Sequence, residues 1–321
     1  MNKTLTRNKE LPTFFGNVQS KGKRLHSAFE NNIKPKLFYQ HENGQLWQGD
    51  CIEWLKMLSN ESVDLIFADP PYNIKKTNWD SFENQEEYIK FSMRWIEQAS
   101  RVLKPSGTLF VCGFSEILAD IKHPASRFFN SCRWIVWHYK NKANLGKDWG
   151  RSHESILHFR KTKNFTFNID DVRIPYGEHT LKYPNHPQAK TSQYSNGKKD
   201  DHLWEPNPLG AKPKDVIEIP TTCNGMYEKT PHPTQKPEEL LRKLILASSN
   251  IGNTIIDPFC GSGTTAVCAE QLQRKWKACD LSQEYLDWTI NRIELVEECD
   301  IETWIKYDFD NMKRRYSIRG N

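Results

Sequence analysis

Short apolar runs alternate with amphipathic segments along most of this chain, and this alternation restricts its fold more than any other feature. The runs VDLIFA, TLFVCGF and NTIIDPF are rich in β-branched and aromatic residues, as buried strands are. Between the runs lie segments with apolar residues at steps of three and four, of which EEYIKFSMRWIEQASRVL is the longest. Because strands that alternate with helices build a helix-covered parallel sheet, the sequence predicts a doubly wound α/β fold.

The alternation stops between residues 164 and 231. Ten of the chain's seventeen prolines fall between residues 160 and 237, and the polar run KTSQYSNGKKDD lies in the same stretch. Proline neither donates to a sheet ladder nor continues a helix, and this composition is typical of surface loops. We therefore expect a loop-rich insert at 164–231 rather than a second doubly wound domain.

The bulk composition is that of an ordinary globular protein. Of 321 residues, 37% are hydrophobic and 26% are charged, and no apolar run approaches the roughly 18 residues of a membrane span. The N-terminus lacks the apolar core of a signal peptide, so we expect a cytoplasmic protein. Eight Lys or Arg against two Glu give residues 1–36 a charge of +6, while the whole chain carries +5. Such a basic arm suits a phosphate backbone, and a solvated tail fits the charge equally well.

The eight cysteines form no Cys-x-x-Cys pair, which argues against a zinc site and against a secreted disulfide framework. Several lie inside apolar runs, where a buried reduced thiol is the ordinary interpretation. We therefore expect no bound metal, and reduced thiols at Cys51, Cys112, Cys132, Cys223, Cys260, Cys268, Cys279 and Cys299.

The stretch FADPPYN continues directly from the predicted strand SVDLIFA. Two adjacent prolines, Pro70 and Pro71, remove two backbone donors and fix two φ angles, so neither the strand nor an ordinary helix continues there. Asp69 and Tyr72 are therefore held rigidly at the carboxyl end of a core strand. An acid and a flat ring in that place predict a functional site at the mouth of the sheet.

A second predicted strand leads into DPFCGSGTT, residues 257–265. Glycines between a buried strand and a helix let a ligand approach the backbone closely. Asp280 ends the next strand, seventeen residues after Gly263, where an acid can receive the two hydroxyls of a ribose. This spacing indicates a cofactor that contains adenosine. A P-loop would need Gly-Lys at the turn, whereas Gly263 is followed by Thr264.

A dinucleotide stays open, because Gly261, Gly263 and Ala266 fit the Gly-x-Gly-x-x-Ala pattern. However, the carboxylate of Asp257 just before the turn would face a pyrophosphate unfavourably. It suits a cationic ligand better, such as an ammonium group near a methionine-type sulfonium.

Together, DPPY and DPFCGSGTT resemble the motifs of DNA amino-methyltransferases that use S-adenosylmethionine. More narrowly, the chain resembles the permuted, β-group adenine methyltransferases of bacterial type II restriction–modification systems, in which the catalytic half precedes the cofactor half. Here QGDC and DPPYN lie early, and HPTQKP, DPFCGSGTT and ACD lie late, so the pattern spans residues 44–297. The resemblance implies a circularly permuted class I methyltransferase fold with a doubly wound, mostly parallel seven-stranded sheet.

The resemblance also divides the chain into five expected parts. These are a basic arm (1–38), a catalytic half (39–163), a target-recognition insert (164–231), a cofactor-binding half (232–300) and a C-terminal extension (301–321). Double-stranded DNA is the implied partner, and a cognate restriction endonuclease would share the DNA site without contact. An orphan regulatory methyltransferase would look the same, and pairing into a homodimer stays open.

The residue types at DPPY fit the chemistry that the resemblance places there. The exocyclic amine of adenine is a poor nucleophile because its lone pair is delocalised into the ring. Asp69 and the Pro70 carbonyl, held outward by Pro71, can each accept one N–H and localise that lone pair, while Tyr72 offers a stacking face. The target base must be flipped out of the duplex at a cost of a few kcal/mol. Because a sulfonium is already a cationic electrophile, no metal is required.

By the same resemblance, Asp280 binds the cofactor ribose, Asp50 and Cys51 lie near its adenine, and HPTQKP closes over its methionine end. Lys236 has an ordinary alternative as an exposed lysine at a helix start. The full set of expected cofactor residues is Asp50, Cys51, Thr234, Lys236, Asp257, Phe259, Cys260, Gly261, Ser262, Gly263, Thr264 and Asp280. The expected substrate contacts are Asn73, Trp79, Arg151 and His153, with Lys198, Lys199, Lys212 and Lys214 of the insert as candidates for phosphate.

Several alternatives stay open. The same site would serve cytosine N4 or an adenine in RNA, although cytosine N4 usually goes with SPPY and Asp69 favours adenine. Methylation of a protein glutamine usually goes with NPPY. An NAD-dependent oxidoreductase would leave DPPY unexplained, and a non-enzymatic DNA-binding module would make both motifs relics.

Overall fold

The computed structural model describes residues 34–73, 82–141, 147–184, 186–187, 203–296 and 299–317. Within them, one sheet has the strand order β1-β2-β11-β10-β3-β4-β6-β5-β9. Its strands are β1 (Lys36–Gln40), β2 (Gly44–Gln48), β3 (Val63–Ala68), β4 (Leu103–Gly113), β5 (Ser131–His138), β6 (His153–Arg160), β9 (Val216–Glu218), β10 (Thr254–Asp257) and β11 (Lys275–Asp280).

The centre of the sheet is parallel, and two strands outside this centre, β1 and β6, run in the opposite direction. Strands β2, β11, β10, β3 and β4 are parallel neighbours. Strand β6 is antiparallel to both β4 and β5. The amino end of β6 therefore lies beside the carboxyl end of β4, where Ser155 is paired with Gly113. This reversal brings the first residues of β6 to the same edge as the ends of the parallel strands.

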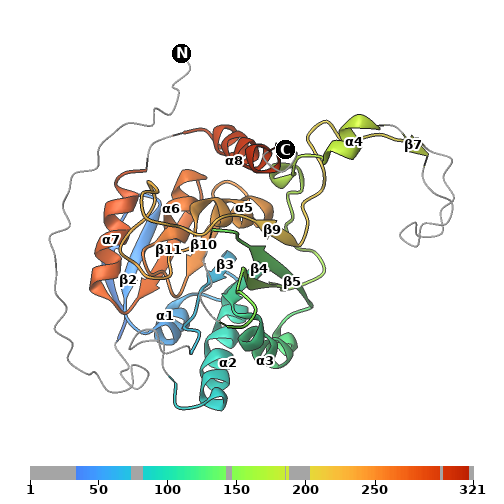
Figure 1. Cartoon of the computed structure of the whole chain (residues 1–321). Helices are drawn as coiled ribbons and strands as arrows, with labels where there is room; N and C mark the ends of the chain where they lie inside the picture. Colours follow the sequence, from blue (N-terminus) through green and yellow to red (C-terminus); the bar gives the residue numbers. More distant parts are fainter. Residues whose placement is uncertain are drawn as a thin grey trace.

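Helices cover both faces of the sheet (Figure 1). One layer holds α1 (Cys51–Met57), α2 (Gln85–Val102) and α3 (Ser115–Ala125), and the other holds α5 (Glu238–Ser248), α6 (Thr264–Gln271) and α7 (Gln283–Ile293). Each layer closes its own hydrophobic core, one around Trp54, Trp95 and Leu109, the other around Leu244, Ala266 and Trp276. The buried residues of α2 recur at helical spacing, as the sequence predicts, whereas α5 and α6 are buried on nearly all sides.

A last helix, α8 (Ile301–Ser317), lies against α5 (Figure 1). Arg242 of α5 donates to both carboxylate oxygens of Asp308 at 2.8 and 2.9 Å, and Arg315 pairs with Glu239. A buried guanidinium with a bidentate partner is satisfied in this geometry, so the helix is fixed to the body by charge as well as by apolar contact. The described helices include none that is both long and apolar enough to span a bilayer.

The predicted doubly wound, mostly parallel α/β sheet is confirmed, with three differences. The sheet has nine strands where seven were expected, because β1 and β9 extend its two edges. Residues 104–107 (KPSG), expected to separate the helix from the next strand, lie within β4, which already begins at Leu103. The extension 301–317 is a helix.

The insert is loop-rich, as expected. It holds the short elements η2 (Asp170–Val172), α4 (Glu178–Lys182), β7 (His186–Pro187) and β8 (Leu203–Trp204) before β9. Its α4 and β7 project away from the sheet (Figure 1).

The cysteines are unpaired, and five of the eight are buried; Cys132 and Cys299 are partly buried and Cys223 is exposed. The described part of the chain brings together no group of three or more metal-ligating side chains.

Candidate active site

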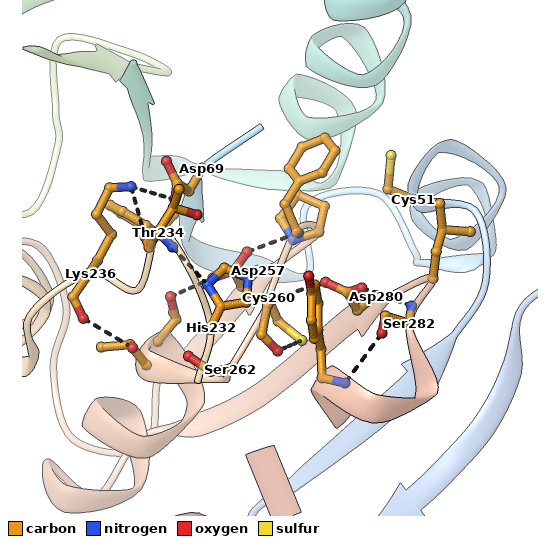
Figure 2. A pocket seen from close by; sticks show the side chains of 18 of the residues that line it. Cys51, Asp69, His232, Thr234, Lys236, Asp257, Cys260, Ser262, Asp280 and Ser282 are labelled. Atoms are coloured by element: carbon orange, nitrogen blue, oxygen red, sulfur yellow. Dashed lines mark hydrogen bonds and ion pairs between the residues drawn. The ribbon is translucent and has the colours of Figure 1, made fainter. Parts of the chain in front are cut away.

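One pocket lies at the carboxyl ends of β2, β11, β10 and β3, where the two sequence motifs meet (Figure 2). Each of these parallel strands ends in an acidic residue at this edge or just beyond it, so the carboxylates converge. The expected residues that line the pocket are Asp50, Cys51, Asp69, Pro71, Thr234, Lys236, Asp257, Phe259, Cys260, Gly261, Ser262, Thr264 and Asp280.

Asp69 makes two short polar contacts at the floor of this pocket. The Lys236 ammonium donates to its Oδ2 at 2.6 Å, and the Tyr72 hydroxyl donates to its Oδ1 at 2.6 Å. Only 6% of the Lys236 side chain is exposed, so its alternative as a solvated lysine at a helix start is wrong. The edge of the Tyr72 ring packs against Phe114, with centroids 4.9 Å apart.

A second carboxylate completes this cluster. Glu154, the second residue of β6, lies with its Oε2 3.1 Å from the Tyr72 hydroxyl and 3.5 Å from Lys236 Nζ. Burial raises the pKa of Asp69 above its ordinary value; Lys236 lowers that pKa and Glu154 raises it further. Burial alone lowers the pKa of Lys236, but the carboxylates of Asp69 and Glu154 raise it well above its ordinary value. Lys236 therefore stays charged at neutral pH.

The glycine turn between β10 and α6 is shaped by two left-handed residues. Gly261 has φ +49° and Gly263 has φ +78°. A Cβ atom on Gly263 would lie 2.3 Å from Cγ2 of Thr289, so only glycine fits there without a shift. The N–H of Gly261 donates to Asp280 at 2.8 Å, which ties the turn to the end of β11.

Asp257 is buried at the start of the turn. The Thr265 hydroxyl donates to its Oδ2 at 2.5 Å, and the Phe259 N–H donates to its Oδ1 at 2.9 Å. Burial raises the pKa of Asp257 to about 7, while those two hydrogen bonds lower it. Burial also lowers the pKa of His232, another pocket residue, to about 3. At pH 7 the Asp257 carboxyl is therefore poised between its two forms, and the imidazole is neutral.

Asp50 also has a structural task. Its Oδ1 accepts the backbone N–H groups of Ile52 and Glu53, each at 2.9 Å, and so caps the N-terminus of α1. A capping carboxylate satisfies helix donors that would otherwise lack partners. Cys51, the first residue of α1, is buried beside it, and burial raises the pKa of its thiol well above the ordinary value.

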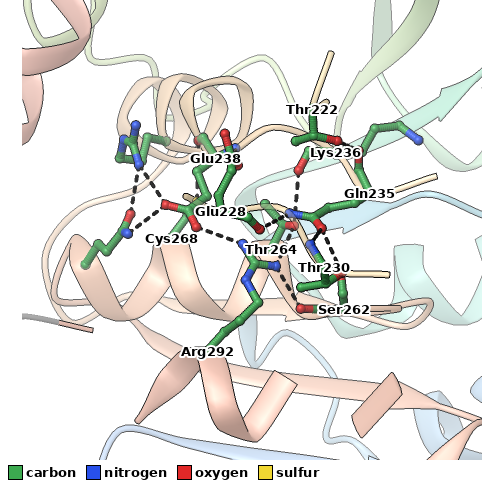
Figure 3. A network of polar contacts seen from close by, with 12 residues as sticks. Thr222, Glu228, Thr230, Gln235, Lys236, Glu238, Ser262, Thr264, Cys268 and Arg292 are labelled. Carbon is green, nitrogen blue, oxygen red and sulfur yellow. Dashed lines mark hydrogen bonds and ion pairs between the residues drawn. The ribbon is translucent and has the colours of Figure 1, made fainter. Parts of the chain in front are cut away.

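A network of charged side chains supports the turn from below (Figure 3). Arg292 of α7 donates to the Ser262 carbonyl at 2.8 Å and to the Thr264 hydroxyl at 3.0 Å. Its other terminal nitrogen pairs with Glu238 at 2.7 Å, two residues after Lys236. Arg292 thus links the glycine turn to the segment that carries Lys236.

The expected substrate residues do not gather in the pocket. The Asn73 side chain accepts the Phe82 N–H at 3.0 Å. Arg151 stacks on Phe114, with its guanidinium carbon 3.8 Å from the ring centroid, and pairs with Glu116. His153 is the first residue of β6, paired with His138. Trp79 lies outside the described residues, as do Lys198 and Lys199, whereas Lys212 and Lys214 lie within them.

Of the remaining expected residues, Pro70 is buried next to Asp69, and Gly263 is the N-cap of α6, between the pocket residues Ser262 and Thr264. Several residues at the site were not expected individually, among them Glu154 and Tyr285. His232 also lines the pocket, and it opens the segment HPTQKP that was expected to close over the cofactor. The position of Glu154 directly before the apolar run SILHF was a usable signal. Nothing in the sequence placed Tyr285, because it comes from the far side of the pocket on α7.

The charges in the pocket fit a cationic ligand. The described lining residues include four aspartates, Asp50, Asp69, Asp257 and Asp280, against one lysine that is already paired with Asp69. A pyrophosphate would meet net repulsion in such a site, whereas a ligand with hydroxyls, an ammonium group and a sulfonium would find acceptors. The residues present therefore fit S-adenosylmethionine and do not fit a dinucleotide.

Comparison with known sequences agrees with this chemistry. The DNA methylase model for N6 and N4 methyltransferases (N6_N4_Mtase) matches residues 63–292. The type II methyltransferase M1.MboII of Moraxella bovis is 34% identical over 264 residues, which are 79% of this chain and 99% of that protein. DNA adenine methyltransferase YhdJ of Escherichia coli (strain K12) is 33% identical over 84% of this chain and 88% of its own.

Solved structures share the fold at lower identity. The cytosine-N4-specific PvuII DNA methyltransferase superposes with a TM-score of 0.62 at 20% identity, over 88% of this chain and 96% of that one. The complex of M1.HpyAVI with S-adenosylmethionine (SAM) superposes with a TM-score of 0.52 at 22% identity, over 78% of this chain and all of that one.

The fold and the pocket together define a class I SAM-dependent methyltransferase. The chain belongs to the DNA methylase family of N6 and N4 amino-methyltransferases. It is therefore a DNA methyltransferase, which overturns the oxidoreductase and the non-enzymatic alternatives.

Proposed function

We propose that this protein transfers a methyl group from S-adenosylmethionine to the N6 amine of an adenine flipped out of duplex DNA. The observation that carries the proposal is the meeting of two motifs in one pocket. Asp69, from the end of β3, lines the same pocket as Asp257 and Gly261, from the end of β10. A methyl acceptor held at Asp69 would therefore lie next to a cofactor held at the glycine turn.

The acceptor side of the site needs hydrogen-bond acceptors rather than a strong base. Asp69 and the Pro70 carbonyl would each take one N–H of the amine, which localises the nitrogen lone pair for attack. The N–C bond would form as the S–C bond breaks, and the electron pair of the S–C bond would stay on sulfur. The positive charge then lies on the methylated amine, beside Asp69, and one N–H proton leaves to Asp69 or to solvent.

The cofactor side is formed by residues at the ends of β2, β10 and β11. Asp280 would accept hydrogen bonds from the ribose hydroxyls. The Phe259 ring packs nearly perpendicular to that of Trp95, with centroids 5.3 Å apart, and would support a ring of the cofactor. Asp257 would face the ammonium end. When bound, the cofactor supplies an electrophilic methyl group on a cationic sulfur.

The proposed contacts with DNA come from residues outside the pocket. We assign target recognition to the insert 164–231, where Lys212 and Lys214 are candidates for phosphate contact. Arg151, which stacks on Phe114 next to Tyr72, and His153, the first residue of β6, are further candidates for contact with DNA. Protection of DNA from a cognate endonuclease is the fitting role, because M1.MboII and other matched relatives are named type II methyltransferases.

Cytosine N4 is the second candidate acceptor. The PvuII enzyme, specific for that position, has the same fold. YhdJ, a DNA adenine methyltransferase, is more similar to this chain in sequence than the PvuII enzyme is. Asp at position 69 also favours adenine.

Nucleoside analysis decides between the two bases. The purified protein is incubated with labelled SAM and mixed-sequence duplex DNA, and the DNA is digested to nucleosides. We expect N6-methyladenine. N4-methylcytosine would keep the chemistry and correct the base, whereas no DNA product, despite bound cofactor, would refute the proposed function.

A further inference from the structure

Glu154 is a buried carboxylate in the site to which the proposed function gives no task. It is 8% exposed, and its Oε2 lies within reach of three side chains from three different elements. These are the Tyr72 hydroxyl at 3.1 Å, the Lys236 ammonium at 3.5 Å and the Cys112 thiol at 3.7 Å. A buried carboxylate is costly unless it has such partners, so its position calls for a function.

Asp69 is proposed to accept an N–H of the target amine, but both of its carboxylate oxygens already accept hydrogen bonds from other side chains. Its Oδ1 accepts from Tyr72 and its Oδ2 accepts from Lys236, both at 2.6 Å. An incoming N6 amine is a neutral donor, and it must compete at Oδ2 with a charge-assisted bond about twice as strong. An ammonium at that distance also opposes the positive charge that develops on the amine. Each carboxylate oxygen can accept a second hydrogen bond, but Asp69 becomes a stronger acceptor for the amine once Lys236 has moved off it.

Glu154 is an alternative acceptor for both donors, the Lys236 ammonium and the Tyr72 hydroxyl. Lys236 Nζ lies between the two carboxylates, 2.6 Å from Asp69 and 3.5 Å from Glu154, so a shift of about an ångström exchanges its partner. The Tyr72 hydroxyl has one proton and two carboxylates within 3.1 Å. Asp69 and Glu154 together carry one negative charge in excess of Lys236. Moving the lysine therefore leaves that excess on Asp69, where the amine binds.

We propose that Glu154 is a positioning residue that takes over Lys236 and the Tyr72 hydroxyl when the base enters, and so frees Asp69 for the amine. This inference rests on the proposed function. The titratable or charged groups around Glu154 are Asp69, Tyr72, Cys112, Tyr139, Arg151 and Lys236. Among these described groups Asp69 is the one carboxylate, so Glu154 is the second carboxylate within reach of the lysine.

The test substitutes Glu154→Gln and measures three quantities: the SAM dissociation constant, kcat on duplex DNA, and the acidic limb of the pH profile of kcat. We expect SAM affinity within about twofold of the wild type and kcat lower by roughly 10- to 100-fold. Because the charge of Glu154 raises the Asp69 pKa, its loss should move the acidic limb to lower pH. A purely structural loss would reduce bound cofactor and leave the limb in place.

Two further variants keep the test decisive. Glu116→Gln removes a carboxylate at the rim, paired with Arg151, and should leave the acidic limb unchanged. Glu154→Asp keeps the charge but withdraws it by one methylene, so kcat should fall while the limb stays in its wild-type position. This variant carries the test if Glu154→Gln does not bind SAM.

A kcat within twofold of the wild type in the variant that binds SAM, or an acidic limb that does not move in Glu154→Gln, would overturn the inference. A wild-type protein that methylates no DNA would refute the proposed function instead.

Discussion

The ammonium of Lys236 lies 2.6 Å from Oδ2 of Asp69, although 167 positions separate the two residues in the chain. One residue follows β3 and the other precedes α5, so the contact joins the two motif-bearing halves. An ion pair this deeply buried holds together only when both partners and their remaining hydrogen bonds are in place. The site is therefore a product of the complete fold, and each half alone holds only part of it.

Asp69→Ala should separate binding from chemistry. The variant keeps the glycine turn and Asp280, and Glu154 remains as a partner for Lys236. We expect SAM affinity within a few-fold of the wild type and methyl transfer reduced by about 10²- to 10⁴-fold or more, because the acceptor amine loses its hydrogen-bond acceptor. Isothermal titration and single-turnover assays measure the two. Near-normal transfer would remove Asp69 from the catalytic assignment.

Cofactor affinity should rise as the pH increases through neutrality. Burial raises the pKa of Asp257 to about 7, so this carboxyl is largely neutral at pH 6 and largely ionised at pH 8. If the cationic ligand binds the ionised form alone, the dissociation constant falls by about tenfold between these two pH values. His232 adds nothing in this window, because its pKa is lowered to about 3.

Asp257→Asn is the control for that pH dependence. The amide keeps the shape of the side chain and its contact with Thr265. We expect the affinity of the Asn variant to be low and nearly flat from pH 6 to 8. The linked effect on stability has the opposite sign. Between about pH 4 and 7 the native state binds more protons than the unfolded state, so the unfolding free energy of the wild type falls as the pH rises. A wild-type binding curve as flat as that of the variant would contradict the prediction.

The glycine turn offers a prediction about backbone shape. Gly263→Ala should destabilise the protein by about 2–4 kcal/mol and weaken SAM binding, because the residue has φ +78° and the new Cβ would lie 2.3 Å from Thr289. Gly252→Ala is the matched control, since Gly252 has φ +75° but a Cβ added there would meet no heavy atom within 4 Å. It should lose only about 1 kcal/mol, with unchanged SAM affinity. Equal losses in denaturant melts would show that steric contact at Thr289 is unimportant.

Much of this site is readable in the sequence because its acids stand at strand ends. Asp69, Asp257 and Asp280 each follow an apolar run, and parallel strands bring such positions to one edge of the sheet. Glu154 could not be assigned to the site by this rule. It stands at the beginning of a strand, and it reaches the site only because β6 is reversed, which depends on pairing with β4 and β5.

The edges of the fold were harder to predict for a related reason. Strand β9 is three residues long, and its pairing with β5 comes from tertiary contact rather than from periodicity. Helix α8 carries many charged residues, and its order depends on partners in α5 such as Arg242 for Asp308. Neither partner is visible in the local sequence pattern.

Arg292→Met should weaken the support beneath the glycine turn. The change removes donors to Ser262 and Thr264 and takes one partner from the buried Glu238 (Figure 3). Loss of one partner of a buried ion pair typically costs about 3 kcal/mol, and SAM binding should weaken with it. Arg133→Met is the control, because its 3.6 Å pair with Asp215 is exposed and should contribute less than about 1 kcal/mol. Similar losses of stability in the two variants would contradict a special role for Arg292.

The basic arm is the last feature to test, and residues 1–33 of it lie outside the described residues. They hold six Lys or Arg and two Glu, a net charge of +4. Each phosphate contact steepens the dependence of log K on log salt by about 0.9, so deletion of residues 1–33 should flatten that slope by up to about five. The deletion ends before β1, and SAM affinity serves as the control for folding. Binding to duplex DNA at salt concentrations from about 50 to 200 mM measures the slope by fluorescence anisotropy. An unchanged slope, with cofactor binding intact, would mean that the arm makes no phosphate contacts and that DNA binding depends on the folded body alone.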